Sequence, residues 1–124
     1  MALMFLVMSN KAKQLLYCSY VERVGPDELK RSREDIQSML AEMQPGFRVL
    51  VDLSRVESID IECVPEIGWI MELVDRSGVG MVVRVIPNPQ KDIGMNILTH
   101  FHYRHPPRMV TCASLTEAAK VLSI

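Results

Sequence analysis

The first part of the chain carries two β-prone apolar runs that a short polar segment separates. The runs occupy residues 3–8 and 14–21, and Ser9-Asn10-Lys11-Ala12-Lys13 lies between them. Two such runs joined by a few polar residues are typical of a β-hairpin, because a short loop is enough to reverse the chain between antiparallel strands. The pattern therefore predicts an antiparallel hairpin at the N-terminus.

After residue 24 the pattern alternates between helix-like and strand-like segments. Apolar residues at a helical spacing mark the helices, and short runs rich in Val and Ile mark strands that are buried on both faces. Pro and Gly residues end most of these segments. In chain order we expect a helix at about 25–44, a strand at 47–53, a helix at about 63–76, a strand at 81–86, a helix at about 89–100, a strand at 109–112 and a last helix capped by Ser114.

This order of segments predicts the fold class. Strands that alternate with helices are joined by right-handed crossovers and form a parallel sheet. We therefore expect an α/β fold with a mainly parallel sheet, an N-terminal antiparallel hairpin and about four helices. A chain of 124 residues has the length of one ordinary domain, so we expect a single domain over residues 1–124.

Charge and composition exclude several functional classes. The chain has 14 basic and 15 acidic residues, which leaves no excess of positive charge for sequence-independent binding to nucleic acid. No run reaches the roughly 20 apolar residues of a membrane span, and the apolar start has neither a basic segment nor a cleavage site of a signal peptide. Three cysteines without a CxxC pair indicate free thiols. We expect a soluble, cytoplasmic protein.

No arrangement of residues indicates an enzyme. The six glycines form no phosphate-binding loop, and no Gly-x-Ser-x-Gly motif is present. His100, His102 and His105 are close enough in sequence to suggest zinc, but the first two project from different sides of a helix. We therefore expect no catalytic residue, no cofactor and no metal.

The helix predicted at 63–76 has an aromatic residue outside its main apolar stripe. Trp69 and Leu73 form an i, i+4 pair on the side opposite the stripe. Either a neighbouring helix covers this pair, or the pair is an exposed anchor for a partner protein. Gly68 costs a helix about 1 kcal/mol, so we expect another group to pack closely on its backbone. Cys63, near the start of the helix, is interpreted as an inert buried thiol.

Residues 47–76 carry a family resemblance. A strand that ends in Asp52-Leu53-Ser54, a short gap, Ile59-Asp60 and a helix closed by Ser77-Gly78 resemble the STAS domain of anti-sigma-factor antagonists. The strand at 81–87 and the segment Ser114-Leu-Thr-Glu-Ala-Ala119 resemble later parts of the same domain. The resemblance implies the STAS fold and a non-enzymatic regulatory role, with a partner such as an anti-sigma kinase or a larger signalling assembly.

The family's pattern opens this helix with Asp-Ser-Ser-Gly-Leu, and the chain departs from it. Aligned on Asp60, the two serines fall at Ile61 and Glu62, and the glycine falls at Cys63. Because regulatory members carry a switching phosphate on one of these serines, the resemblance implies a protein in one fixed state. Glu62 either imitates the phosphorylated form weakly or caps the helix. The residues that we expect to contact a partner, or a second copy in a homodimer, are Ser58, Asp60, Ile61, Glu62, Cys63, Trp69 and Leu73.

Two other functions stay open. Asp52 ends a central strand where receiver domains place their phosphoacceptor, although Ser9-Asn10 and Ala113-Ser114 supply neither the further acids nor the lysine of that chemistry. A small ligand-binding domain is the second alternative, and no set of residues in the sequence identifies its ligand.

Overall fold

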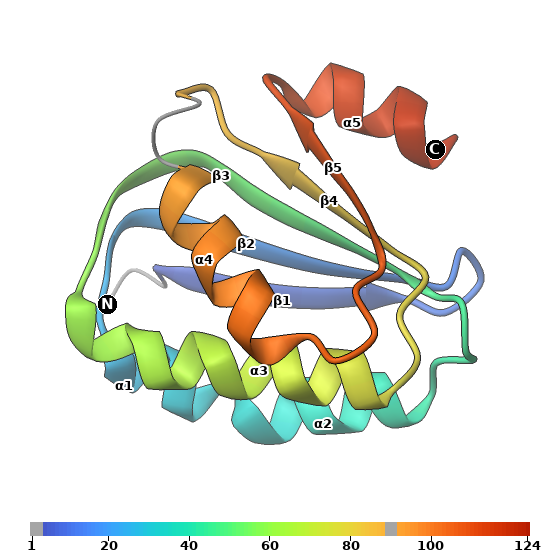
Figure 1. Cartoon of the computed structure of the whole chain (residues 1–124), viewed down its shortest axis with the longest axis horizontal. Coiled ribbons are helices and arrows are strands. Elements are labelled where there is room, and N and C mark those ends of the chain that lie inside the picture. The colour runs from blue at the N-terminus through green and yellow to red at the C-terminus, as the bar shows by residue number, and fades with distance from the viewer. Residues whose placement is uncertain (1–3, 89–91) are drawn as a thin grey trace.

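The strands follow one another across the sheet in chain order. A computed structural model of the chain describes residues 4–88 and 92–124. Its sheet has the order β1-β2-β3-β4-β5 (Figure 1). β1 and β2 pair antiparallel, and every later pair is parallel, which confirms the predicted α/β class and its N-terminal hairpin. The strands are β1 (Phe5–Asn10), β2 (Leu15–Val24), β3 (Arg48–Ile59), β4 (Met81–Val85) and β5 (Arg108–Cys112).

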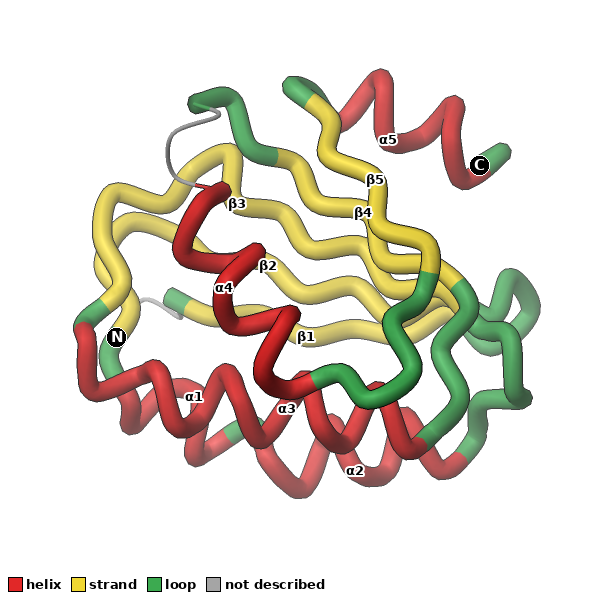
Figure 2. Tube along the Cα trace, in the orientation of Figure 1, coloured by secondary structure: helices red, strands yellow, loops and turns green. Residues whose placement is uncertain are grey.

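The helices lie on both faces of this sheet. Residues of α1, α2, α3 and α4 join the larger apolar core on one face, and α5 covers a smaller core on the other (Figures 1 and 2). A 3-10 turn, η1 (Ile61–Cys63), leads directly into α3. The helices are α1 (Pro26–Arg31), α2 (Arg33–Ala41), α3 (Val64–Arg76), α4 (Asp92–His102) and α5 (Leu115–Leu122).

The described residues form five helices, where about four were expected, because the helix predicted at 25–44 is divided at Ser32. The Ser32 amide donates to the carbonyl oxygen of Leu29, and its hydroxyl donates to that of Glu28, both at 3.1 Å. Ser and Thr hydroxyls that bond backbone carbonyls one turn earlier often bend helices. The division is local, since α2 starts at the next residue.

β3 is longer than the predicted strand 47–53. It continues to Ile59 because Val56 and Ile59 still pack against the larger core, while its second half pairs with the end of β2 after a shift of register. β4 stops at Val85, which pairs with Asp52. The last residues of β3 therefore extend past β4, and this overhang carries η1 beyond the edge of the sheet.

The predicted boundaries of the other segments hold closely. Ser114 caps α5 as expected, with its hydroxyl oxygen accepting the amide of Glu117 at 3.2 Å. The predicted helix start at residue 89 lies outside the described residues, and the helix is described from Asp92. Among the described segments, no helix has both the length and the apolar character that crossing a membrane requires.

Candidate functional site

The segment predicted to contact a partner, residues 58–63, forms a tight connection between β3 and α3. The amide of Asp60 donates to the carbonyl oxygen of Val24 at 3.0 Å, and the amide of Cys63 donates to that of Asp60 at 2.9 Å. These bonds fix the segment to the end of β2. Ser58, Asp60, Ile61 and Glu62 are exposed on it.

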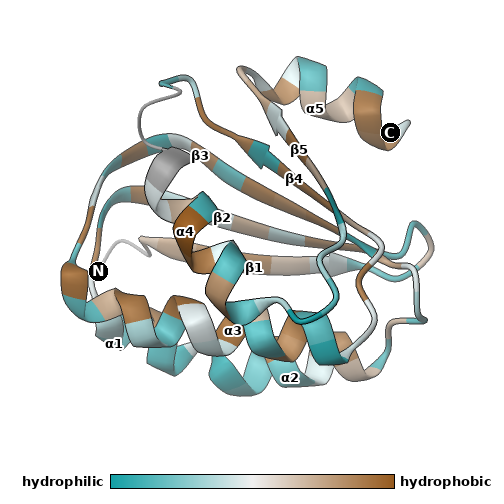
Figure 3. Cartoon of the chain, viewed as in Figure 1, coloured by the Kyte–Doolittle hydropathy of each residue, from teal (hydrophilic) through white to brown (hydrophobic). Residues whose placement is uncertain are grey.

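Exposed apolar residues surround this segment. Ile61 is 80% exposed and Val64 is 39% exposed, and both line a shallow groove between the start of α3 and α4. Ile97 of α4, 52% exposed, lines the same groove and lies next to Phe101, which is 76% exposed. Figure 3 shows apolar residues both in the turn before α3 and along α4. We call Ile61, Val64, Ile97 and Phe101 the apolar patch.

Cys63 is buried below this segment. Its Sγ lies 3.4 Å from the carbonyl oxygen of Val24. Burial, and then the nearby carboxylates of Asp60, Glu28 and Glu62, raise the pKa of the Cys63 thiol to about 11. Because the thiolate is the reactive form, the structure confirms the interpretation of an inert buried thiol.

Glu62 does not cap α3. Cys63 occupies the N-cap position, and no side chain accepts a hydrogen bond there. The 3-10 turn likewise has no side-chain cap. The expected capping role of Glu62 is therefore wrong, because Glu62 lies within the 3-10 turn η1 and not at the N-cap of α3. Its carboxylate stays at the surface.

Trp69 and Leu73 lie on the flank of α3 that faces α2. The guanidinium of Arg33, from α2, stands 4.6 Å from the centre of the Trp69 ring and forms an ion pair with Glu66 at 2.8 Å. Both apolar residues are half-buried against the core. A neighbouring helix thus covers this pair in part, and its contact with a partner stays a prediction.

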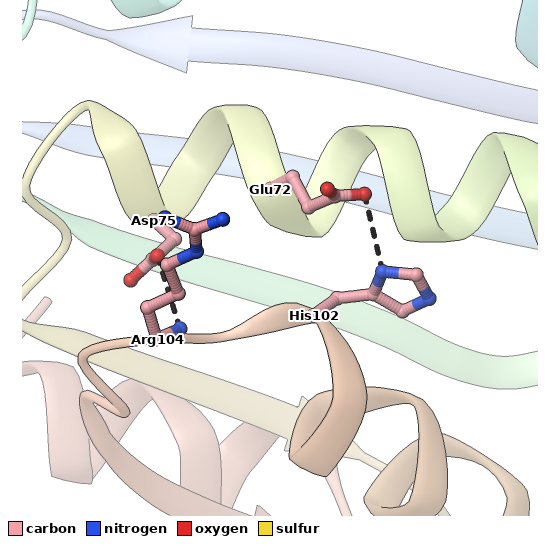
Figure 4. Close-up of polar contacts among 4 residues, drawn as sticks. All are labelled: Glu72, Asp75, His102 and Arg104. Carbon is pink, nitrogen blue, oxygen red and sulfur yellow. Dashed lines mark hydrogen bonds and ion pairs between the residues drawn. The ribbon is translucent and has the colours of Figure 1, made fainter.

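The opposite flank of α3 faces α4. The Nδ1 of His102 lies 3.1 Å from an Oε of Glu72, and Asp75 accepts the amide of Arg104 at 3.1 Å (Figure 4). Asp75 also accepts the amide of His105 at 3.3 Å. A Cβ on Gly68 would come within 2.6 Å of the His102 ring, which confirms the close packing predicted at Gly68. The structure therefore places the predicted contact residues on two flanks of α3: the 58–63 segment borders α4, and Trp69 and Leu73 border α2.

The two chemistries that the sequence left as alternatives, a zinc site at the histidines and a phosphoacceptor at Asp52, receive no support from this arrangement. The described residues contain no group of three side chains that could hold a metal ion. Asp52 is 1% exposed and accepts hydrogen bonds from the Tyr17 hydroxyl at 3.1 Å and from the amide and hydroxyl of Ser54 at 2.9 and 2.6 Å. A buried and fully engaged carboxylate cannot reach a phosphoryl donor, which argues against the receiver-like alternative.

Sequence reasoning missed the contribution of α4 and of Arg33. The i, i+4 spacing of Ile97 and Phe101 was the available signal for an apolar face on α4. Arg84 is a further signal, a charged residue within a Val- and Ile-rich run. It is buried in β4 and bonds Thr99 and Asn96, which ties α4 to the sheet.

Comparison with known proteins gives the fold. No protein-family model matches the chain, and no curated protein matches it by sequence. Among solved structures, an uncharacterized DUF3478-family protein with a SpoIIAA-like fold from Shewanella loihica PV-4 superposes with a TM-score of 0.73 at 11% identity, over 95% of this chain and 91% of that one. The anti-sigma factor antagonist SpoIIAA in its unphosphorylated form gives 0.62 at 16% identity, over 96% and 97%.

A third structure, a putative anti-sigma factor antagonist from Thermotoga maritima, gives a TM-score of 0.61 at 16% identity, over 98% of this chain and 96% of that one. All three cover nearly the whole of each chain, so the likeness concerns the complete arrangement of strands and helices. The chain therefore has the SpoIIAA-like α/β fold of anti-sigma-factor antagonists, and at the level of the fold the STAS resemblance of its sequence is confirmed.

Proposed function

We propose that this chain is a non-enzymatic regulatory module that binds a signalling protein, such as an anti-sigma kinase or a larger signalling assembly, through residues 58–63. Structures with the same fold are named as anti-sigma factor antagonists, which supports a role of this kind. The observation that carries the proposal is the exposure of Ile61 at the tip of η1.

An apolar side chain on a fixed turn suits protein binding. Backbone hydrogen bonds hold both ends of the 58–63 segment, so little conformational entropy is lost when a partner docks. Burying an isoleucine side chain contributes about 2 kcal/mol, which makes a central apolar residue a strong anchor. The exposed carboxylates of Asp60 and Glu62 flank Ile61 and favour a partner with basic residues.

The module works in one fixed state. Ile61 and Glu62 have no hydroxyl group to phosphorylate, and Cys63 is buried. Ser58 is the nearest hydroxyl on the segment. The described cysteines are free and buried, which suits the reducing environment of the cytoplasm.

The test measures binding to purified anti-sigma kinases encoded in the same genome, by isothermal titration calorimetry. Ile61→Asp should weaken binding at least 30-fold, which corresponds to about 2 kcal/mol. Ile124→Asp, at an exposed position past α5, is the matched control and should leave the affinity unchanged. Equal effects of the two variants, or no binding by any of these kinases, contradict the proposal.

Incubation with the bound kinase and ATP tests the fixed state. Mass spectrometry should find residues 60–63 unmodified. Stoichiometric phosphate on Ser58 that changes the affinity for the kinase would mean that the switch has moved, and would contradict a fixed state.

One observation favours ligand binding as a second candidate function. A pocket of about 270 Å³ lies where β3 extends past β4, between Ser54, Ser58 and Ile86, and ligands of open α/β sheets bind at the carboxyl ends of strands. This volume is near the lower limit for small-molecule sites. Native mass spectrometry of the protein purified without denaturant tests this function, and an unmodified mass counts against it.

A further inference from the structure

The two edge strands of the sheet differ in how they are protected. β5 follows Pro106-Pro107 and starts with the exposed cation Arg108, and both features keep an edge strand from pairing with another chain. β1 contains neither a proline nor a charged residue, and its six residues pair with β2 without a shift of register. Within the described residues β1 pairs with β2 alone (Figure 1). Its outer edge is therefore available for the addition of a strand.

The outer edge of β1 opens onto a groove of about 240 Å³. Phe5, Leu6 and Val7 line one side of this groove, and Arg31 and Asp35 line the other. Successive side chains of a strand point to opposite faces of the sheet, so a groove that touches three consecutive residues runs along the backbone edge itself. The peptide groups at this edge are thus accessible to another chain.

The peptide groups that face this edge are arranged symmetrically about Val7. The amide of Val21 donates to the carbonyl oxygen of Met4 at 2.8 Å, so Met4 is bonded to β2. Because bonded and non-bonded pairs alternate along an antiparallel ladder, the peptide groups of Phe5, Val7 and Ser9 point away from β2. An antiparallel strand centred on Val7 can exchange hydrogen bonds with all three.

We infer that two copies of this chain pair through β1, antiparallel, about a two-fold axis at Val7, so that their two sheets become one. In this register Phe5 lies opposite the partner's Ser9, and Leu6 lies opposite the partner's Met8. Leu6 and Met8 are on the face of β1 away from the larger core, where Leu6 is half-buried and Met8 is 57% exposed. Each covers the other across the axis, and apolar pairs of this kind stabilise a sheet.

The charge at one end of β1 is positive. Residues 8–16 and 42–50 come together there, because the amide of Gln44 donates to the side chain of Gln14 at 2.7 Å. These residues hold three cations, Lys11, Lys13 and Arg48, against the single carboxylate of Glu42. The turn that follows β1 is therefore cationic.

The charge at the other end is negative. Residues 21–28 and 55–62 come together there, because the amide of Asp60 donates to the carbonyl oxygen of Val24 at 3.0 Å and the carboxylates of Asp60 and Glu28 both lie close to Gly25. This end has two cations, Arg23 and Arg55, against six carboxylates. The carboxylates are those of Glu22, Asp27, Glu28, Glu57, Asp60 and Glu62.

This distribution of charge selects a second copy as the added strand. A two-fold rotation about Val7 exchanges the two ends, so the cationic turn of each copy meets the anionic end of the other. An extended chain of uniform charge would match one end and be repelled at the other. The inference goes beyond the proposed function and does not depend on it.

Sedimentation equilibrium of the full chain tests the inference. The wild type should show a monomer–dimer equilibrium, and Met8→Lys should raise its dissociation constant at least about 10-fold, because the ammonium group would face the partner's Leu6. Ile97→Lys, at a site on α4 that is 52% exposed, is the matched control and should leave the dissociation constant unchanged. Circular dichroism and urea unfolding confirm that each variant is folded.

Three outcomes of this measurement overturn the inference. The first is a chain that stays monomeric at about 1 mM. The second is a series of open-ended oligomers, because a two-fold axis closes the assembly at the dimer. The third is a dimer that Ile97→Lys weakens as much as Met8→Lys, since its contact would then lie on α4 or elsewhere.

Cysteine cross-linking tests the register. Val7→Cys should form an intermolecular disulfide under mild oxidation, because the Cα atoms of a hydrogen-bonded antiparallel pair lie about 5.5 Å apart. Ser9→Cys is the control, since its two copies would lie about 14 Å apart, beyond the reach of a disulfide. The cysteines already present are buried, and non-reducing mass spectrometry measures the products. Equal cross-linking by the two variants, or none by Val7→Cys, overturns the inference.

Discussion

On the side of α3 that faces α2, one arginine closes the surface, whereas on the side that faces α4 polar bonds join the helices and apolar residues stay exposed. Arg33 reaches both the carboxylate of Glu66 and the ring of Trp69. On the other side His102 and Asp75 make the contacts, and Phe101 points to solvent. The first flank thus covers its aromatic residue with a charged side chain, whereas the second leaves apolar side chains in contact with solvent.

The two flanks also differ in what their polar groups do. Glu66 is buried, so its charge depends on Arg33 for compensation. Glu72 is exposed and well hydrated, so its contact with His102 contributes little to the stability of the fold. Removing one partner should therefore have very different consequences on the two sides.

The largest effect is expected for Arg33→Ala. It leaves the buried carboxylate of Glu66 without its partner and uncovers Trp69, so the free energy of unfolding should fall by about 2 kcal/mol in urea titrations. Arg31→Ala, at the exposed last residue of α1 two positions earlier, should change it by less than about 0.5 kcal/mol. If the two variants are equally stable, the contacts of Arg33 with Glu66 and Trp69 do not stabilise the fold.

Replacing one apolar residue of each flank by serine gives the next largest effect. Leu73→Ser removes a half-buried side chain and should lower the free energy of unfolding by about 1.5 kcal/mol. Ile97→Ser, at an exposed site, should change it by less than about 0.5 kcal/mol. A large loss for Ile97→Ser would show that α4 buries this residue.

A double-mutant cycle on the α4 flank should show that the effect of Gly68→Ala on the free energy of unfolding depends on His102. Gly68→Ala improves helix propensity by about 1 kcal/mol, but its Cβ displaces the His102 ring, so the variant should be no more stable than the wild type. In a His102→Ala background the same substitution should stabilise the protein by about 1 kcal/mol, measured by urea unfolding. Additive effects would mean that His102 does not pack on Gly68.

Alkaline pH should weaken the fold slightly through Cys63, which lies below the junction of the two flanks. Folding raises the pKa of this thiol from 9.0 to about 11, so the unfolded chain loses the proton first. The contribution of this proton to stability is complete below about pH 8. It is lost as the pH rises from the pKa of the unfolded chain, 9.0, to that of the folded chain, about 11. Between about pH 8 and about pH 9.5 the free energy of unfolding of the wild type should fall by about 1 kcal/mol more than that of Cys63→Ala. Urea unfolding at these two pH values measures the difference. Equal losses would mean that the thiol is not buried.

Most of the fold could be predicted from periodicity, and the exceptions have local causes. Val49 and Val51 mark β3 clearly, but the polar residues after Leu53 conceal its second half, which exists because the end of β2 pairs with it. Ser32 divides a helix whose apolar stripe continues unchanged on both sides, and only its hydrogen bonds show the division.

The candidate site was predicted less completely. Sequence spacing placed Trp69 and Leu73 off the main stripe of α3, but it could not show that the long side chain of Arg33, more than 30 residues away, would lie over the indole. Ile61 and Glu62 were predicted as contact residues only because the sequence resembles a known family. The closeness of Ile61 to Ile97 depends on the crossover through β4, which no local pattern contains.

The agreement between strand order and chain order has a consequence for how the molecule acquires its fold. Because each strand lies beside the one that precedes it in the sequence, no strand has to insert between two that are already paired. The hairpin of β1 and β2 can form first and offer one edge to β3, and β4 and β5 then add to the same growing side. Chains emerge from the ribosome in this same direction. The sheet can therefore be assembled strand by strand during synthesis, with each loop closed over a short stretch of chain and with little opportunity for kinetic trapping.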